Sequence, residues 1–139
     1  MSYAGDLTPR EAFELLRDDG DAVLVDVRTE AEWTYVGVPD ADALRRPPVF
    51  ASWLPVEQEA PGARFLAELA RAGVEPGRGA AVVFLCRSGK RSVAAAEAAT
   101  AAGIAPSYNV LDGFEGDLDE HGHRGGAGWR AQGLPWRQS

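Results

Sequence analysis

The segment AAVVFLCRSGKRSVAAAEAATAAG, residues 80–103, decides the fold because it contains a strand pattern, a short turn and a helix pattern in direct succession. Its first six residues form an apolar run of the kind that fits a strand buried on both faces. The part after the turn is rich in alanine, the best helix former, and Gly103 follows it as a helix-ending residue. A strand that leads directly into a helix is the repeating unit of a parallel sheet.

The same alternation extends in both directions. Upstream, Thr8 and Glu11 have capping-box spacing at the start of an expected helix, and Thr29 and Glu32 repeat that spacing after a strand pattern. Further patterns predict strands at 22–27, 49–54 and 107–111 and a helix at 63–73. Such alternation predicts the α/β fold class, with a mainly parallel sheet covered on both faces. A length of 139 residues predicts one domain over 1–139.

Charge and composition exclude several classes of function. The chain has 14 basic and 21 acidic residues, a net charge of −7, which argues against general binding to nucleic acid or to anionic membranes. No apolar run reaches the length of a membrane span, and the amino terminus does not resemble a signal peptide, so we expect a soluble cytoplasmic protein. A single cysteine forms no internal disulfide, and His121 and His123 lack the further ligands of a metal site.

The turn CRSGKRS, residues 86–92, concentrates the chemistry of the chain, since it contains the only cysteine and the only lysine. Its amide groups lie between a strand and a helix, where they can surround an anion, and Gly89 permits a tight turn. The cations Arg87, Lys90 and Arg91, together with the helix dipole, favour the thiolate form of a cysteine. We therefore expect a nucleophile at Cys86 and an anion site around it. The alternative is a buried, inert cysteine beside solvated charges.

Three stretches together resemble the rhodanese family of sulfurtransferases. VVFLCRSGKRSVAAAEAATAAG is similar to the active-site loop of that family, VLVDVRTEAEW to its Asp-x-Arg motif, and GWRAQGLP to its closing segment. The resemblance implies a three-layer fold with a mainly parallel sheet of about five strands. It also implies that Cys86 carries a persulfide, taking sulfur from thiosulfate or a related donor and giving it to cyanide or a thiol.

By the same resemblance no cofactor or metal is needed, and a protein is a further option as sulfur donor or acceptor. The substrate would be held by the backbone amides and charges of the loop, which comprises Arg87, Ser88, Gly89, Lys90, Arg91 and Ser92.

Other residues receive structural interpretations. We expect Arg28 to pair with a carboxylate and fix the loop beside the site, rather than to bind substrate. The aromatic residues Trp33, Tyr35 and Trp53 are interpreted as core more readily than as pocket lining. VGVPDAD, from Val36, lacks the histidine and second glycine that the family usually has there. The acidic insertion 113–128 is either a lid or partner surface, or a passive insertion, and the passive interpretation is favoured.

Two other functions compete with sulfur transfer. A cysteine phosphatase would need an arginine six positions after the cysteine, whereas Arg91 is five positions after Cys86 and Ser92 occupies the sixth. A binding or sulfur-carrier module would keep the fold without independent turnover, and the presence of Cys86 argues against a module that has lost its chemistry.

Overall fold

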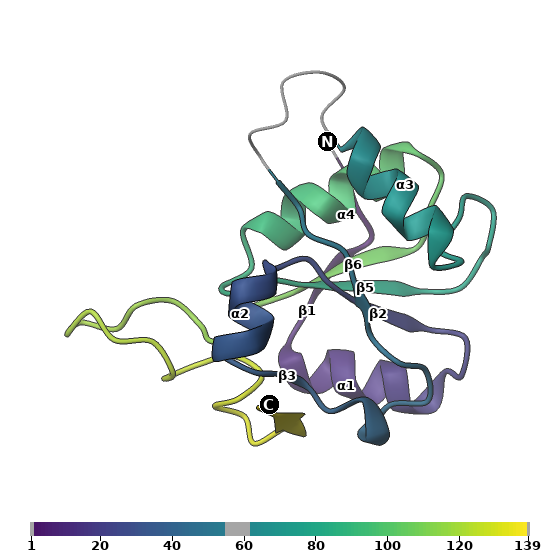
Figure 1. Cartoon of the computed structure of the whole chain (residues 1–139). Helices are drawn as coiled ribbons and strands as arrows, with labels where there is room; N and C mark the ends of the chain where they lie inside the picture. Colours follow the sequence, from purple (N-terminus) through teal and green to yellow (C-terminus); the bar gives the residue numbers. More distant parts are fainter. Residues whose placement is uncertain (1, 55–61, 139) are drawn as a thin grey trace.

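The computed structural model describes residues 2–54 and 62–138. In this part of the chain five parallel strands form the central sheet, in the spatial order β1-β6-β5-β2-β4 (Figure 1). In that order they are Gly5–Leu7, Ser107–Val110, Val82–Leu85, Val23–Asp26 and Val49–Phe50. The parallel α/β sheet predicted from the alternation of patterns is therefore confirmed.

Helices cover the sheet on both faces, which gives the three layers visible in Figure 1. They are α1 (Pro9–Asp18), α2 (Glu30–Tyr35), α3 (Ala63–Arg71) and α4 (Arg91–Ala101), with a short 3₁₀ helix, η1, at Ala41–Ala43. Helices α3 and α4 pack on one face, where Phe65 and Ala95 contact Val25 and Phe84 in one buried cluster. Helix α1 and the carboxyl-terminal segment cover the other face, in a second cluster that includes Leu16, Leu85, Phe114 and Trp129.

The local signals at the helix starts are confirmed. The side chain of Thr8 accepts a hydrogen bond from the amide of Glu11, and the Glu11 carboxylate accepts one from the amide of Thr8. Thr29 and Glu32 form the same reciprocal pair at the start of α2. Each pair satisfies two amide groups that the first turn of a helix would otherwise leave unbonded, which is why these two helices begin where the sequence predicts.

Four short strands differ from the expectations. Strand β1 was not predicted, and β4 is shorter than the predicted 49–54, although the amides of Ala51 and Trp53 continue to bond Asp26 and Val27. Strands β3 (Val38–Pro39) and β7 (Trp136–Arg137) form an additional antiparallel pair that was also not predicted. Strands of two or three residues are too short to produce a readable alternation of apolar and polar residues.

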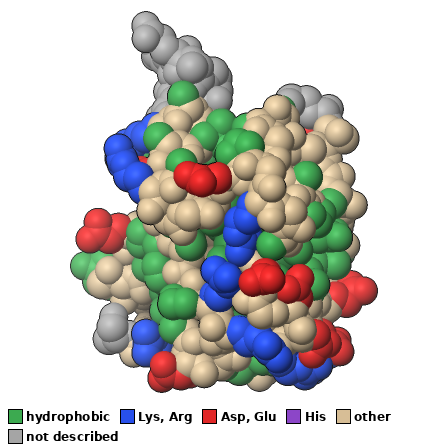
Figure 2. Space-filling view, turned by 90° about the vertical axis from the view of Figure 1, so that its right-hand side faces the viewer, with side chains coloured by type: hydrophobic (Ala, Val, Ile, Leu, Met, Phe, Trp, Pro, Cys, Tyr) green, Lys and Arg blue, Asp and Glu red, His purple; other side chains and the backbone are tan. Residues whose placement is uncertain are grey.

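On the surface in Figure 2, basic and acidic side chains are interspersed with apolar ones, and no broad patch of one charge is seen on that face. None of the helices in the described ranges combines the length and apolar composition needed to cross a lipid bilayer.

Candidate active site

The parallel sheet brings Cys86 to the carboxyl edge of the two central strands. It follows β5 directly, and the amide of Val27, just beyond β2, bonds the carbonyl of Leu85 at 2.8 Å. This is the edge at which open α/β sheets bind ligands. The residues after Cys86 form a loop that leads into α4 at Arg91. The predicted strand–turn–helix unit is thus present, with the thiol at its turn.

The loop folds back so that one of its own amides reaches the sulfur. The N–H of Gly89 donates to Cys86 Sγ at 3.1 Å, and Cys86 is only 1% exposed, so the sulfur lies beneath the loop. Gly89 has φ +101°, and a Cβ there would lie 3.4 Å from the amide of Asp112. The left-handed backbone favours glycine at this position, as the sequence predicted.

The six loop residues assigned to substrate binding occupy three different environments. Arg87 and Lys90 are exposed at the surface of the loop, Ser88 and Gly89 are half-buried, and Ser92 is fully buried below. Arg91 is half-buried. The cations available to an approaching anion are therefore Arg87 and Lys90.

Arg91 is bound by a carboxylate of another element. Its Nη1 and Nη2 donate to the two oxygens of Glu32 at 2.8 and 2.9 Å. Burial alone would raise the pKa of Glu32, but hydrogen bonds from Arg91 and Thr29 and the charge of Arg91 lower it to about 2. The hydrogen bond and charge of Glu32 in turn raise the pKa of Arg91. The expected role of the Arg91 side chain in holding substrate charge is thus weakened, because that charge is already neutralised.

Below the loop, Cys86 contacts Ser92, which begins a row of polar side chains whose other members sequence reasoning missed. Ser92 Oγ lies 3.1 Å from Cys86 Sγ and 2.5 Å from Oδ1 of Asn109, a buried residue of β6. Asn109 Nδ2 donates to Oδ1 of Asp6 on β1 at 3.0 Å, and the Tyr3 hydroxyl donates to the same oxygen at 2.8 Å. One signal in the sequence pointed to Asn109, since it interrupts an otherwise strand-like run with a primary amide.

Arg28 has the structural role expected for it. Its side chain forms a two-pronged ion pair with Asp26, with the shortest contact 2.7 Å from Nη2, and both side chains are fully buried. The same Nη2 donates to the carbonyl of Gly37 at 2.8 Å, and the guanidinium lies 4.2 Å from the centre of the Phe114 ring. Among the described residues Nη1 of Arg28 has no hydrogen-bond partner. The pair thus ties β2 to the segment after α2 and to Phe114.

The first residues of the insertion 113–128 form hydrogen bonds to the loop that carries Cys86. The amide of Phe114 bonds the carbonyl of Cys86 at 2.8 Å, and the amides of Glu115 and Gly116 bond that of Arg87 at 2.9 and 3.2 Å. A Cβ at Gly113 would lie 2.6 Å from the carbonyl carbon of Arg87. The passive interpretation of the insertion is therefore wrong for residues 113–116, which support the loop. Beyond them, the segment extends away from the body of the molecule (Figure 1).

The two histidines lie in this extended part. Both are exposed, and their amides donate to Oδ1 of Asp119 at 2.9 and 2.8 Å. Across residues 2–54 and 62–138 no group of three or more His, Cys, Asp or Glu side chains is placed to hold a metal ion.

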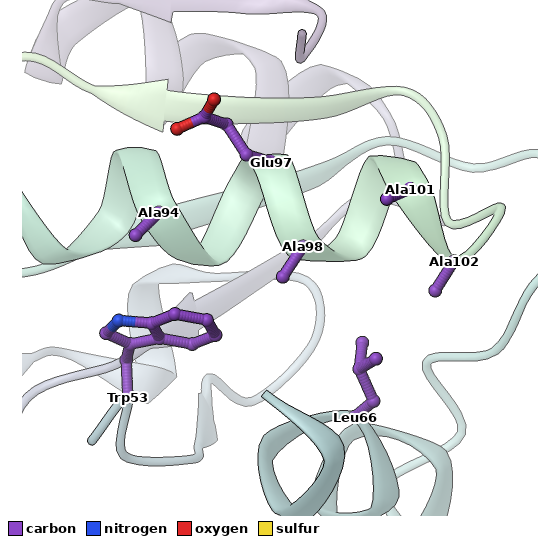
Figure 3. Close-up of a pocket in the computed structure, with 7 residues that line it drawn as sticks. All are labelled: Trp53, Leu66, Ala94, Glu97, Ala98, Ala101 and Ala102. Carbon is purple, nitrogen blue, oxygen red and sulfur yellow. The ribbon is translucent and has the colours of Figure 1, made fainter. Parts of the chain in front are cut away.

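The three aromatic residues considered from the sequence lie in three different surroundings. Tyr35 is 77% exposed, and Trp33 packs edge-on against Phe50. Trp53 packs against Phe65 and lines a groove of about 490 Å³ together with Leu66 and the alanine face of α4 (Figure 3). No residue of the loop 86–91 lines that groove, so it is a separate apolar feature.

Comparison with known proteins identifies relatives of this fold. A family model, Rhodanese-like domain, matches residues 8–120. Uncharacterized protein RC0915 of Rickettsia conorii is 38% identical over 91% of this chain and 92% of its own. The crystal structure of Rv0390 from M. tuberculosis has 57% identity and a TM-score of 0.85, covering 99% of this chain and 100% of that one.

A further solved structure has an activity in its name. The polysulfide-sulfur transferase homodimer from Wolinella succinogenes has 25% identity and a TM-score of 0.66, covering 96% of this chain and 78% of that one. The matched family model spans most of the described sheet and includes the cysteine loop. The chain accordingly belongs to the rhodanese-like domain family.

Proposed function

We propose that the protein is a sulfurtransferase that moves a sulfane sulfur through a persulfide on Cys86. The observation that carries this proposal is the Gly89 N–H at 3.1 Å from Cys86 Sγ, in a loop that exposes Arg87 and Lys90. A sulfur nucleophile needs donors of this kind, because it is anionic when it reacts. Membership of the rhodanese-like family and likeness to a polysulfide-sulfur transferase support the same chemistry.

The reaction would proceed in two half-steps. With thiosulfate as donor, the Cys86 thiolate attacks the outer sulfur, a new S–S bond forms at Sγ, and the donor's S–S bond breaks with its electron pair leaving on sulfite. An acceptor such as cyanide or a thiol then attacks the outer sulfur of the persulfide and regenerates the thiolate. Charge is conserved in each half-step, and the scheme predicts ping-pong kinetics.

The arrangement of charge suits a small anionic donor. Arg87 and Lys90 are exposed above the buried sulfur, while Arg91 is neutralised by Glu32. Backbone amides and two surface cations would therefore attract the anion.

The phosphatase alternative fits less well. Transfer of a phosphoryl group needs a guanidinium that faces the equatorial oxygens, and the nearest candidate in the loop, Arg91, already binds Glu32 through both terminal nitrogens. The sixth position after Cys86 is occupied by Ser92, which is buried against Asn109. A sulfur carrier that receives its sulfur from a protein remains the second candidate.

The decisive experiment is intact mass measured after incubation with thiosulfate. Wild-type protein should gain the mass of one sulfur atom, lose it on addition of cyanide or a reducing thiol, and Cys86→Ser should gain nothing. Turnover of thiosulfate to thiocyanate without any mass gain would contradict the persulfide mechanism. Hydrolysis of an aryl phosphate that disappears in Cys86→Ser would instead favour the phosphatase, and loading only by a protein persulfide would favour the carrier.

A further inference from the structure

A continuous row of hydrogen-bonded side chains connects Cys86 with the edge strand of the sheet. It passes from Cys86 Sγ to Ser92 Oγ at 3.1 Å and from Ser92 Oγ to Asn109 Oδ1 at 2.5 Å. It then passes from Asn109 Nδ2 to Asp6 Oδ1 at 3.0 Å. The row crosses three elements, α4, β6 and β1, and its outer end, Asp6, is exposed.

The carboxylate of Asp6, at the outer end of the row, fixes which group donates and which accepts in every hydrogen bond of the row. The carboxylate of Asp6 only accepts, so Asn109 must present its NH₂ group to Asp6 and its carbonyl oxygen to Ser92. The Asn109 carbonyl also only accepts, so the single hydroxyl hydrogen of Ser92 is directed at Asn109. Ser92 Oγ then has only lone pairs left for Cys86, and the bond between them must come from the thiol S–H.

This direction matters because the thiol needs Ser92 Oγ as a hydrogen-bond acceptor, whereas the thiolate needs the Ser92 hydroxyl as a donor. The neutral thiol can donate to Ser92 Oγ while the hydroxyl stays on Asn109. A thiolate or persulfide has no hydrogen to give, and it would be stabilised only if the Ser92 hydroxyl turned toward it and left the Asn109 carbonyl. The row orients hydrogens and does not conduct protons, since the amide of Asn109 neither takes up nor releases one at neutral pH.

We propose that Asp6 and Asn109 are positioning residues that hold the Ser92 hydroxyl away from Cys86 and thereby keep the resting sulfur in its less reactive thiol form. When the sulfur becomes anionic, Ser92 turns and adds a second donor beside the Gly89 N–H. The step at which this matters rests on the proposed function, since persulfide formation is where the anion reacts. The direction of the bonds does not depend on that function.

Other charged side chains lie on the elements around the loop, and they must be kept constant in any test. They come from the loop and α4, from α2 and from β2 and its end, and they belong to Arg87, Lys90, Arg91, Glu32, Asp26 and Arg28. A change at Asp6 leaves all of these side chains in place. It removes one negative charge, which by itself would favour the thiolate, so the design needs a variant that removes the charge but keeps the acceptor.

The experiment compares Asp6→Ala with Asp6→Asn. In Asp6→Ala the amide of Asn109 is free to turn over, its NH₂ group can donate to Ser92, and the Ser92 hydroxyl becomes available to Cys86. Asp6→Asn keeps a carbonyl oxygen for the Asn109 NH₂ group and loses only the charge. The readout is the second-order rate of alkylation by iodoacetamide at mildly acidic pH, which measures thiolate and needs no sulfur donor.

We expect Asp6→Ala to be alkylated about fivefold faster than wild type, the factor equivalent to one hydrogen bond of about 1 kcal/mol. Asp6→Asn should restore a rate close to that of wild type. Ser92→Ala added to Asp6→Ala should abolish the gain, since the hydroxyl that moves is then absent. Far-ultraviolet thiolate absorbance, taken as a difference against Cys86→Ser, should change in the same order.

Three results would overturn the proposal. The first is an equal alkylation rate in Asp6→Ala and wild type. The second is an equal acceleration in Asp6→Ala and Asp6→Asn, which would assign the effect to charge alone. The third is a faster alkylation of Asp6→Ala that persists when Ser92→Ala is added, which would assign it to a general loosening of the structure. Each is distinct from a failure of the sulfurtransferase proposal, because alkylation proceeds whether or not Cys86 accepts sulfur.

Discussion

The carboxylate of Glu32 serves two partners, the first turn of its own helix and the guanidinium of Arg91 at the start of α4. It accepts from the amide of Thr29 at 3.2 Å and from the two terminal nitrogens of Arg91, 59 residues away, at 2.8 and 2.9 Å. One side chain therefore caps α2 and joins it to the end of the cysteine loop. A change in its ionisation affects both elements together.

Replacement of Glu32 by Gln should make the stability of the protein less dependent on acid. The folded pKa of Glu32 is about 2, below its ordinary value of 4.5, so its carboxylate stabilises the fold above pH 4.5 and this contribution is lost as the pH falls toward 2. With allowance for its partial exposure to solvent, we expect Glu32→Gln to lower the free energy of unfolding by about 2 kcal/mol at neutral pH. Urea unfolding measured at neutral pH and near pH 2 checks this.

The difference in the free energy of unfolding between wild type and Glu32→Gln should be smaller near pH 2 than at neutral pH. A matched control is Glu30→Gln, at the first residue of α2, which should have little effect. If Glu32→Gln lowers the free energy of unfolding equally at both pH values, the ionised Glu32–Arg91 pair contributes nothing to stability.

Replacement of Lys90 by Ala should weaken the use of thiosulfate mainly through KM. Lys90 is exposed at the surface of the loop, as is Arg87, so under the proposed function its charge would attract the anion, while the amide of Gly89 stays on the sulfur. An exposed charge contact of about 1 kcal/mol corresponds to about fivefold in kcat/KM, and added salt should reduce the effect. Steady-state kinetics at low and high ionic strength measure it.

The control for Lys90→Ala is Arg71→Ala, which removes a cation from the exposed end of α3. It should leave kcat/KM unchanged. If Lys90→Ala also has no effect at low salt, anion binding depends on Arg87 and the backbone amides alone.

Loss of one partner of the buried Asp26–Arg28 pair should cost far more than loss of both. Arg28→Met leaves the Asp26 carboxylate fully buried without its cation, and we expect a loss of about 3–5 kcal/mol in the free energy of unfolding. The double variant Asp26→Leu with Arg28→Met removes both charges and should recover much of that loss. Urea unfolding of wild type, Arg28→Met, Asp26→Leu and the double variant gives the coupling energy, and additive losses would contradict a buried, mutually dependent pair.

Replacement of Gly113 by Ala should displace the loop that carries Cys86. A methyl group there would lie 2.6 Å from the carbonyl carbon of Arg87, and φ is +58°, so overpacking and backbone strain add to an expected loss of about 2–4 kcal/mol. Gly122→Ala is the control, since Gly122 has φ +75° and its added methyl group would meet nothing within 4 Å. Gly122→Ala should lower the free energy of unfolding by only about 1 kcal/mol and keep full reactivity at Cys86. Equal thermal unfolding midpoints for the two variants would contradict the clash.

The sequence predicted those parts of the structure that depend on neighbouring residues. The caps at Thr8 and Thr29, the buried runs before Cys86 and Arg28, and the turn at Gly89 all rest on local chemistry, and all are present. The apolar run around Phe84 was readable as a strand because helices cover it on both faces, so every residue is buried.

Pairings that form only on folding were not predictable from one sequence. The contact between Glu32 and Arg91 joins residues on two helices, and the row from Ser92 to Asp6 depends on β1 and β6 lying side by side. Strand β1 has three residues, and no periodic pattern marks it. The supporting role of Phe114 was hidden for a different reason, since it acts through its backbone amide, which every residue except proline possesses.

The hydrogen bonds at the base of the extended segment give the protein engineer a defined insertion point. The amide of Gly125 bonds the carbonyl of Glu115 at 2.9 Å, and the amide of Trp129 bonds that of Gly113 at 2.8 Å, so the two arms are joined before the segment leaves the body of the molecule. The contacts to Cys86 and Arg87 come from Phe114, Glu115 and Gly116, which lie at or next to this junction. A peptide tag or a fluorescent label could therefore be grafted between Leu118 and His123. It would lie on the segment that supports the loop of Cys86 and would leave the surroundings of the thiol intact.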